Sequence, residues 1–249
     1  MQAQRRPSFD TEESERLYEY VEQNAPVERD ELEAELSMDP ELIDQEVTML
    51  IQEGYLEDWG GTLQLAIDYG HEVSYETDGM EVTIRPAAQS DLDGLVRVMR
   101  EVTQEEAYLT AESVVELLDD EEVVLRNDKR EFRMFFVATV DDRVVGWVHL
   151  RSPNFAKLRH TAELTMGVEK EYRGHGIGSR LMEHGLEWAE ANGYEKVYQS
   201  LPATNQDAVR FLERHRWETE AIRKAHFKIG DEYVAEQQMA VMLRDPVLE

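Results

Sequence analysis

A glycine-rich segment in the second half of the chain restricts its fold more than any other feature of the sequence. An apolar run ends at Val168, and the segment Arg173-Gly174-His175-Gly176-Ile177-Gly178 follows with three glycines in five positions. Apolar residues then recur at helical spacing, at Leu181, Met182, Leu186 and Ala189. The pattern predicts a strand, a tight loop and a helix in that order. Glycines let the backbone approach a ligand, and the free N–H groups of a helix start attract anions, so the loop is a candidate phosphate site.

Two common phosphate loops fit these residues poorly. A Walker loop needs Gly-Lys-Ser/Thr, whereas Gly178 is followed by Ser179 and Arg180. A dinucleotide-binding fingerprint also has spaced glycines, but its third glycine comes one position later than Gly178 does here. The loop also follows a predicted antiparallel hairpin, over residues 133–151, rather than a first strand of a βαβ unit. Another class of phosphate ligand is therefore expected.

The loop resembles the Arg/Gln-x-x-Gly-x-Gly/Ala pyrophosphate loop of the GNAT superfamily of N-acetyltransferases, with Arg173, Gly176 and Gly178 at the motif positions. Further landmarks occur in the family's order. They are Thr83-Ile84-Arg85-Pro86 as a first strand, Val144-Val145-Gly146-Trp147 as a third strand, and Asn205-x-x-Ala208-x-x-Phe211 as a late helix. The resemblance covers about residues 81–243. It implies transfer of an acetyl group from acetyl-CoA to an amine.

The expected fold of this region is the α/β (α+β) fold of that family. Periodicity from Glu81 onward predicts the element order β-α-α-β-β-β-α-β-α-β-β. The resemblance implies a mixed, mostly antiparallel sheet whose central strands, around Met166 and Val197, splay apart to admit the thioester. We therefore expect an acetyltransferase domain over residues 81–249.

The resemblance also implies how acetyl-CoA is held. The strand backbone of Met166 and Val168 would pair with the pantetheine arm, and Asn205 would hydrogen-bond the arm from the other side. Asn205 alternatively serves as the N-cap of its helix. The pyrophosphate would be held by backbone amides and the Ser179 side chain, with the amides belonging to Tyr172, Arg173, Gly174, His175, Gly176, Ile177 and Gly178.

Acetyl transfer needs a base for the amine and a donor to the oxyanion, and the departing thiolate must either receive a proton or leave without a dedicated acid. Glu163 lies five residues before Val168 on the strand that leads to the loop, and the resemblance implies it as the candidate base, because some relatives place near this position a glutamate that works through a water; a half-exposed strand carboxylate without a role is the alternative. The resemblance implies the backbone N–H of Met166 as oxyanion donor. Two residues depart from well-known relatives: Ser200 replaces an acidic residue, and Leu212 replaces a tyrosine acid. The substitutes by residue type are Tyr198, Tyr233, His226 and His160.

The first 80 residues predict a different order of secondary-structure elements. Residues 11–68 predict three short helices, the third beginning at Asp39-Pro40, and then a strand, a Gly60-Gly61 turn and a returning strand. This order resembles a winged-helix domain. Residues 1–10 are expected to be a flexible terminus. Residues 69–80, which are polar and contain two glycines, are expected to be a linker.

The predicted third helix argues against DNA binding by this domain. Its expected exposed face carries Glu41, Asp44, Gln45, Glu46, Thr48 and Gln52, and no basic residue. Residues 1–76 hold 21 acidic residues and four arginines, a net charge of −17. Phosphate contacts require Lys and Arg, so a docking role toward protein is favoured over DNA, and a purely structural extension is the alternative. A second copy of the chain, giving a homodimer, is another candidate partner.

The composition of the chain bears on metal binding, on location and on the source of the protein. The chain has no cysteine and seven scattered histidines, so we expect no metal site. No apolar run approaches a membrane span and no signal peptide is evident, so a cytoplasmic protein is expected. The net charge is −28 and only six of the 26 basic residues are lysine, a composition typical of proteins from halophilic archaea.

Three candidate functions remain open: an acetyltransferase for a protein lysine or N-terminus, one for a small amine such as a polyamine or antibiotic, and an acetyl-CoA-sensing transcription regulator.

Overall fold

The chain divides into two compact units, which we describe separately. In the computed structural model, residues 9, 11–25, 27–66, 69–105, 109–121, 124, 126–127, 131–153 and 156–244 are described. Residues 1–68 belong to one unit and residues 69–249 to the other. Apart from Phe9, the expected flexible terminus over residues 1–10 lies outside the described residues.

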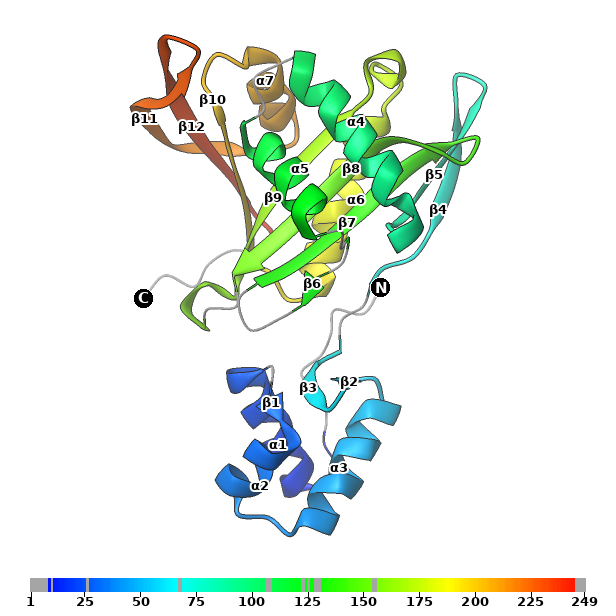
Figure 1. Cartoon of the computed structure of the whole chain (residues 1–249), viewed down its shortest axis with the longest axis vertical. Helices are drawn as coiled ribbons and strands as arrows, with labels where there is room; N and C mark the ends of the chain where they lie inside the picture. Colours follow the sequence, from blue (N-terminus) through cyan, green and yellow to red (C-terminus); the bar gives the residue numbers. More distant parts are fainter. Residues whose placement is uncertain are drawn as a thin grey trace. The chain divides into compact units, whose positions relative to one another are not determined.

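The N-terminal unit contains three helices and a small antiparallel sheet (Figure 1). The elements are α1 (Glu12–Asn24), β1 (Val27–Glu28), α2 (Arg29–Leu36), α3 (Pro40–Gln52), β2 (Leu56–Trp59) and β3 (Thr62–Leu65). The sheet order is β1-β3-β2. The three helices and the hairpin agree with the sequence expectation, whereas the short strand β1 was not expected.

Capping residues and an apolar core explain this unit. The Thr11 side chain accepts from the backbone of Ser14, and the Asp39 side chain accepts from that of Glu41, so both α1 and α3 begin at capped residues. Apolar side chains from all three helices and the strands form one core: Leu17, Val21, Val27, Leu32, Leu36, Ile43, Val47, Leu50, Leu56 and Leu63. Glu46 corrects an expectation: it is buried, not exposed, and accepts a hydrogen bond from Ser14 Oγ. The remaining exposed residues of α3 include no base.

The C-terminal unit is a layered α/β structure. Its strands are β4 (Val73–Thr77), β5 (Met80–Pro86), β6 (Arg126–Asn127), β7 (Glu131–Val140), β8 (Arg143–Pro153), β9 (Thr161–Val168), β10 (Lys196–Pro202), β11 (Glu218–Ile229) and β12 (Glu232–Met242). The helices are α4 (Leu92–Glu105), α5 (Leu109–Glu121), α6 (Ile177–Ala191) and α7 (Gln206–Arg214). Short 3-10 turns cover Gln89–Asp91, Ala156–Leu158 and Lys170–Tyr172. The predicted element order is confirmed, with β4 and β6 added.

The strands form one mixed, mostly antiparallel sheet in the order β11-β12-β10-β9-β8-β7-β5-β4, and β6 pairs with β7 (Figure 1). The parallel pair is β9 with β10, and it extends over three positions, ending at Tyr198 opposite Glu163. Beyond that position β10 continues beside β12 alone, while β9 continues beside β8 alone. The two central strands therefore diverge toward their C-terminal ends, as the resemblance implied.

Helices cover both faces of this sheet (Figure 1). On one face α4 and α5 pack on a cluster that includes Phe135, Val137 and Trp147. On the other face α6 lies across β8, β9 and β7. Gly167 shows how tightly β9 packs, because a Cβ at that residue would come within 2.2 Å of the Trp147 ring. The sheet is therefore packed against helices on both faces.

The expected linker over residues 69–80 differs from what the structure shows. Val73–Thr77 form β4, which pairs antiparallel with β5 from Val73–Ile84 to Thr77–Met80. Asp78 and Gly79 make the two-residue turn, with φ of 48° and 78°. An Asp-Gly pair is a strong signal for such a tight hairpin, because both residues adopt positive φ readily. This segment belongs to the C-terminal unit.

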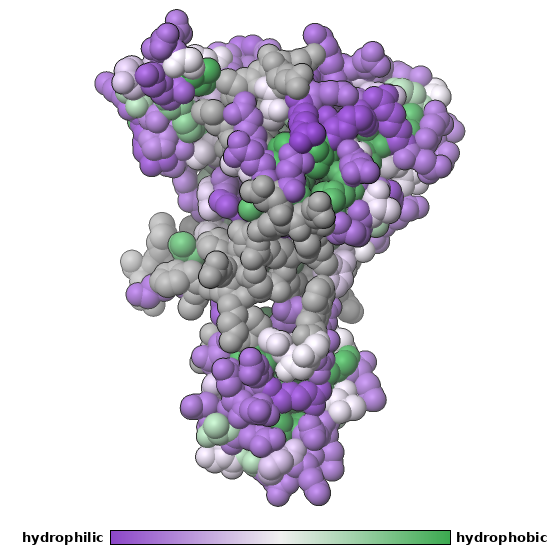
Figure 2. All heavy atoms as spheres, in the orientation of Figure 1, coloured by the Kyte–Doolittle hydropathy of each residue, from purple (hydrophilic) through white to green (hydrophobic). Residues whose placement is uncertain are grey.

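The surface of both units is strongly hydrophilic in the view of Figure 2, as the composition requires. Within the described residues, no helix has both the length and the apolarity needed to cross a bilayer.

Candidate functional site

The divergence of β9 and β10 leaves one edge of β9 without a strand partner. The run from Leu164 to Val168 is paired with β8 on one side, and no pairing with β10 continues past Glu163. At about 3.3 Å per residue, five residues give a free edge of roughly 16 Å. Exposed N–H and C=O groups along such an edge can accept an extended ligand as an additional strand.

The loop that follows β9 places its backbone amides in two groups. The amides of Tyr172 and Arg173 donate to the carbonyls of Glu169 and Lys170, at 2.9 and 3.2 Å, within a 3-10 turn. Those two amides, which were expected to hold pyrophosphate, are therefore already hydrogen-bonded. The loop then passes through Gly174, with φ of 85°, and reaches the start of α6.

Gly176 is the N-cap of α6 and has φ of 81°, a left-handed conformation that favours glycine. Its carbonyl accepts from the amide of Arg180 at 3.1 Å, the first hydrogen bond of the helix. Helix geometry leaves the amides of Ile177, Gly178 and Ser179 without a carbonyl in the helix, and the helix dipole adds positive charge there. This end of α6 can bind an anion such as a phosphate.

Packing holds the helix start against the free edge of β9. Ile177 is buried, with 1% of its surface exposed. A Cβ built at Gly178 would lie 3.7 Å from side-chain atoms of both Met166 and Val168, and 3.8 Å from Phe211. Met166 and Val168, predicted to hold the cofactor arm, therefore lie beside Gly178 of the loop. The structure brings these predicted binding residues together.

Arg173 takes a position that the motif did not indicate. Its Nε donates to the carbonyl oxygen of Val168 at 2.8 Å. The side chain therefore folds back on the end of β9 and ties the loop to that strand. The Val168 carbonyl, which was expected to face the cofactor arm, has a protein partner here.

Glu169 is a site residue that the sequence analysis missed. Its carboxylate accepts from Arg97 of α4 and from Arg143 at the start of β8, the latter at 2.7 Å. Burial, and then a hydrogen bond with Glu101, raises the pKa of Glu169, while the two guanidinium groups act against that rise. This network anchors the root of the loop to α4. Because Arg97 lies 72 residues before Glu169, no local pattern could have revealed the pair.

Asn205 takes the N-cap role, one of the two roles considered for it. Its Oδ1 accepts from the Ala208 amide at 3.1 Å, which makes it the N-cap of α7. Its Nδ2 is buried and has no hydrogen-bond partner among the described residues. A buried amide without a partner is costly, and it fits a ligand that supplies a carbonyl oxygen. The residues at this site therefore fit the amide-containing arm of acetyl-CoA as well as its phosphates.

Glu163 and Tyr198 lie at the closed end of the divergence, as register partners. Strand alternation directs both side chains to the sheet face covered by α4 and α5. Glu163 accepts from Arg151 Nη2 at 2.8 Å. Burial, and then the Glu163 carboxylate, raises the pKa of Tyr198, with Arg151 acting against the rise. A carboxylate and a protonated phenol thus lie where the free edge of β9 begins.

The other proposed substitutes lie in different surroundings. Tyr233 is 71% exposed on the β11–β12 hairpin, and His160 is an exposed turn residue whose carbonyl accepts from Glu195. His226 Nε2 lies 3.8 Å from the Glu236 carboxylate, on the outer strands. Leu212 is a core residue. Tyr198 is therefore the substitute that the structure places beside Glu163.

Ser200 hydrogen-bonds with the carboxylate of Glu236 on the neighbouring strand β12. Burial alone raises the pKa of Glu236, but hydrogen bonds from Arg223 and Ser200 outweigh it and lower that pKa. Ser200 lies two residues beyond Tyr198 on the same face of β10. Glu236, which the sequence analysis did not identify, therefore keeps a negative charge near Ser200.

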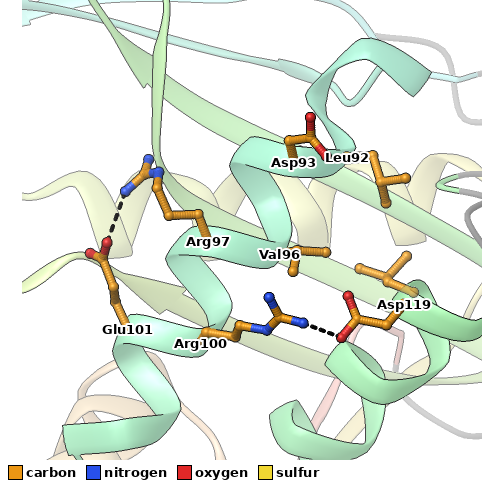
Figure 3. A pocket seen from close by; sticks show the side chains of 8 residues that line it. Leu92, Asp93, Val96, Arg97, Arg100, Glu101 and Asp119 are labelled. Atoms are coloured by element: carbon orange, nitrogen blue, oxygen red, sulfur yellow. Dashed lines mark hydrogen bonds and ion pairs between the residues drawn. The ribbon is translucent and has the colours of Figure 1, made fainter.

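A separate hollow of about 440 Å³ lies between α4 and α5 (Figure 3). Leu92, Val96 and Leu118 contribute apolar surface, and the charges on its rim form ion pairs between Arg97 and Glu101 and between Arg100 and Asp119. Since those charges neutralise one another, the hollow offers less for chemistry than the loop. In the part of the chain that the structure describes, no cluster of three or more His, Asp or Glu side chains could hold a metal ion.

Comparison with known proteins relates this architecture to one family. The sequence model described as "Acetyltransferase (GNAT) family" matches residues 98–216, which lie within the C-terminal unit. The structure is similar to that of yncA from Salmonella typhimurium, described with its cofactor acetyl-CoA. The TM-score is 0.55 at 14% identity, covering 68% of this chain and 97% of that one. At that identity, the likeness concerns the fold.

Two curated proteins share detectable sequence similarity with the chain. Probable N-acetyltransferase san of Drosophila melanogaster is 28% identical over 93 residues, which is 37% of this chain and 50% of that protein. N-alpha-acetyltransferase 50 of Danio rerio is 26% identical over 93 residues, which is 37% of this chain and 55% of that protein. The chain thus spans about half the length of the curated relatives that it matches.

Proposed function

We propose that the C-terminal unit, whose residues 98–216 match the model of the GNAT acetyltransferase family, transfers an acetyl group from acetyl-CoA to a primary amine. The observation that carries this proposal is the free edge of β9 running into the glycine loop at the start of α6. The edge suits an extended arm with amide groups, and the helix start suits a pyrophosphate. Acetyl-CoA combines both groups and supplies an activated thioester.

We assign the binding roles to residues already placed at this site. The amides of Ile177, Gly178 and Ser179, with that of Gly176, are proposed to hold phosphate, and the Ser179 hydroxyl would add a donor. The buried Nδ2 of Asn205 would donate to a carbonyl of the arm. The backbone of Met166 would pair with the arm along β9. These roles follow from donors without a partner in the helix or, for the buried Asn205 Nδ2, among the described residues.

The chemical step requires that one bond forms and one breaks. The amine nitrogen bonds to the acetyl carbon, the carbon–sulfur bond breaks, one amine proton leaves and the sulfur receives a proton. We propose that Glu163 takes the amine proton and that Tyr198 donates to the sulfur. The backbone N–H of Met166 would donate to the oxyanion. Tyr198 suits the role of donor because it is the register partner of Glu163 and its phenol, with a raised pKa, is protonated near neutral pH.

We propose a protein amine, a lysine side chain or an N-terminus, as the acceptor. The zebrafish relative is named an N-alpha-acetyltransferase, which supports this class. The N-terminal unit adds support, because its three helices and hairpin resemble the order of a winged-helix module, which we propose as a docking domain. Its acidic third helix suits docking to a basic protein segment rather than to DNA.

The test is an acceptor-dependent thiol-release assay with the full-length protein and acetyl-CoA in molar KCl. Matched peptides with a free N-terminus, with one internal lysine, or with both blocked would be compared with spermidine. We expect thiol release with at least one unblocked peptide and none with the blocked peptide. Acceptance of spermidine alone would instead assign a small amine as acceptor. Binding of CoA without thiol release for any acceptor would contradict the enzymatic proposal.

A further inference from the structure

The β4–β5 hairpin lies against the glycine loop, although it precedes it by about 100 residues. Thr77 Oγ1 donates to the carbonyl oxygen of His175 at 3.0 Å. His175 Nδ1 donates to Asp78 Oδ2 at 2.5 Å. Both hairpin residues lie at or beside the Asp78-Gly79 turn. The tip of the hairpin therefore contacts the residue between Gly174 and Gly176.

A third contact extends this interface to the first turn of α6. The guanidinium carbon of Arg180 lies 4.2 Å from the centre of the Tyr75 ring, a cation–π distance. Tyr75 and Thr77 are two residues apart and so face the same side of β4. One face of β4 therefore contacts both the glycine loop and the start of α6.

The hydrogen bond from Thr77 has a consequence for the loop backbone. The peptide that joins His175 and Gly176 is planar and trans, so its carbonyl and its N–H point in opposite directions. Thr77 holds the carbonyl, and this directs the Gly176 N–H away from the hairpin. Glycines on both sides of His175 have positive φ and no atom within 4 Å of a built Cβ, so no packed side chain surrounds this peptide at either glycine.

We propose that Thr77 and Asp78 are positioning residues of the CoA site: they hold the His175–Gly176 peptide so that its N–H faces the pyrophosphate. This inference rests on the proposed function. A loop that is free to rotate this peptide would present the amide only part of the time, and the apparent affinity falls by that fraction. The hairpin therefore sets the affinity for the phosphate end of acetyl-CoA, not the rate of the chemical step.

The test compares CoA binding by calorimetry and steady-state kinetics for the full-length protein and its variants. Thr77→Val removes the hydroxyl and keeps the β-branched shape. We expect the Kd for CoA and the KM for acetyl-CoA to rise about three- to tenfold, as loss of one net hydrogen bond allows, with kcat unchanged. Thr77→Ser should restore both values to within about twofold of the original.

A matched control lies on the same hairpin. Thr83→Val makes the same change in β5, where the hydroxyl bonds with Ser74 at 2.9 Å, away from the loop. Its CoA affinity should equal that of the unmodified protein. If Thr77→Val unfolds, Asp78→Asn replaces it, because Asn-Gly preserves the turn while weakening the pair with His175. A smaller rise in Kd, about twofold to fourfold, is expected for it.

The outcomes separate the two proposals. If the unmodified protein binds CoA and both variants bind it equally well, the positioning role is rejected while the acetyltransferase proposal stands. If the unmodified protein does not bind CoA, both proposals fail. A fall in kcat at unchanged KM would also reject the positioning role, because it would place Thr77 in the chemical step.

Discussion

Glu163 and Tyr198 face each other at the last paired position of β9 and β10, immediately before the strands diverge. The pair is therefore fixed by the sheet and not by a mobile loop. Arg151 holds the Glu163 carboxylate at 2.8 Å, and the carboxylate in turn contributes to the raised pKa of Tyr198. A base and an acid carried on adjacent strands would keep their separation throughout a reaction.

The first prediction concerns this pair. Glu163→Gln and Tyr198→Phe should each lower kcat by about 10²- to 10⁴-fold, the usual contribution of a general base or acid. The Kd for CoA should stay constant, since neither side chain lies at the phosphate loop. Two matched controls are Glu187→Gln on the exposed side of α6 and Tyr233→Phe on the outer hairpin, which should retain full activity. Unchanged kcat in either test variant would remove that residue from the mechanism.

A second prediction uses two glycines at opposite ends of α6. Gly176 and Gly193 have φ of 81° and 84°, and a Cβ at either residue would meet no atom within 4 Å. Glutamate at either position therefore suffers the same backbone strain, on the order of 1–2 kcal/mol. Gly176→Glu should abolish CoA binding because its carboxylate repels pyrophosphate, whereas Gly193→Glu should bind normally. Calorimetric titration with CoA measures both, and equal affinities would contradict the placement of the phosphate.

How much of this site could be predicted depended on the distance between interacting residues. The loop, the helix after it and the N-cap role of Asn205 were predictable, since their signals span only a few residues. The ion pairs of Glu169 with Arg97 and Arg143 were not, because they join three separate elements. Glu236 beside Ser200 escaped notice for the same reason.

For the fold as well, features with local sequence signals could be predicted and features that depend on distant residues could not. Strand alternation and helical periodicity predicted the main elements, because those patterns report which face of each element is buried. The sequence instead predicts a linker where β4 lies, since this strand is at the sheet edge, is largely exposed and carries no apolar alternation. Glu46 was expected on an exposed face because a glutamate in a helix is usually solvated; its burial depends on Ser14, 32 residues away.

A third prediction follows from two buried histidines. Burial, with a contribution from His71, lowers the pKa of His184 to about 4, and burial, with Arg133 and Arg151, lowers that of His149 to about 3. An unfolded histidine titrates near pH 6.5, so below that pH the unfolded chain binds protons that the folded chain does not. The free energy of unfolding should therefore fall from about pH 6.5 to about pH 4, by up to about 1.4 kcal/mol per pH unit for each histidine.

Urea unfolding at about pH 7 and about pH 5 measures this slope. His184→Phe keeps an aromatic ring beside Phe136, at the place where the histidine ring lies 4.6 Å away, and removes the proton site. The variant should lose less stability than the original protein between the two pH values. Equal losses would show that His184 does not contribute to the acid sensitivity.

A fourth prediction concerns salt. At a net charge of −28 the folded chain repels itself, and the Debye length falls from about 10 Å at 0.1 M salt to about 3 Å at 1 M. We expect Tm to rise markedly between 0.1 M and molar KCl, consistent with the hypothesis of a halophilic source. Calorimetric melting in both solutions checks this, and a Tm that does not change would exclude that hypothesis.

The position of β4 also bears on where the chain can be cut. The sequence match to the family begins at residue 98, and the first strand with a family landmark begins at Met80. A fragment that starts at either point would lack Tyr75, Thr77 and Asp78, so its glycine loop would have no support on that side. The smallest autonomous piece with full cofactor affinity should therefore start at Tyr69, where the second unit begins.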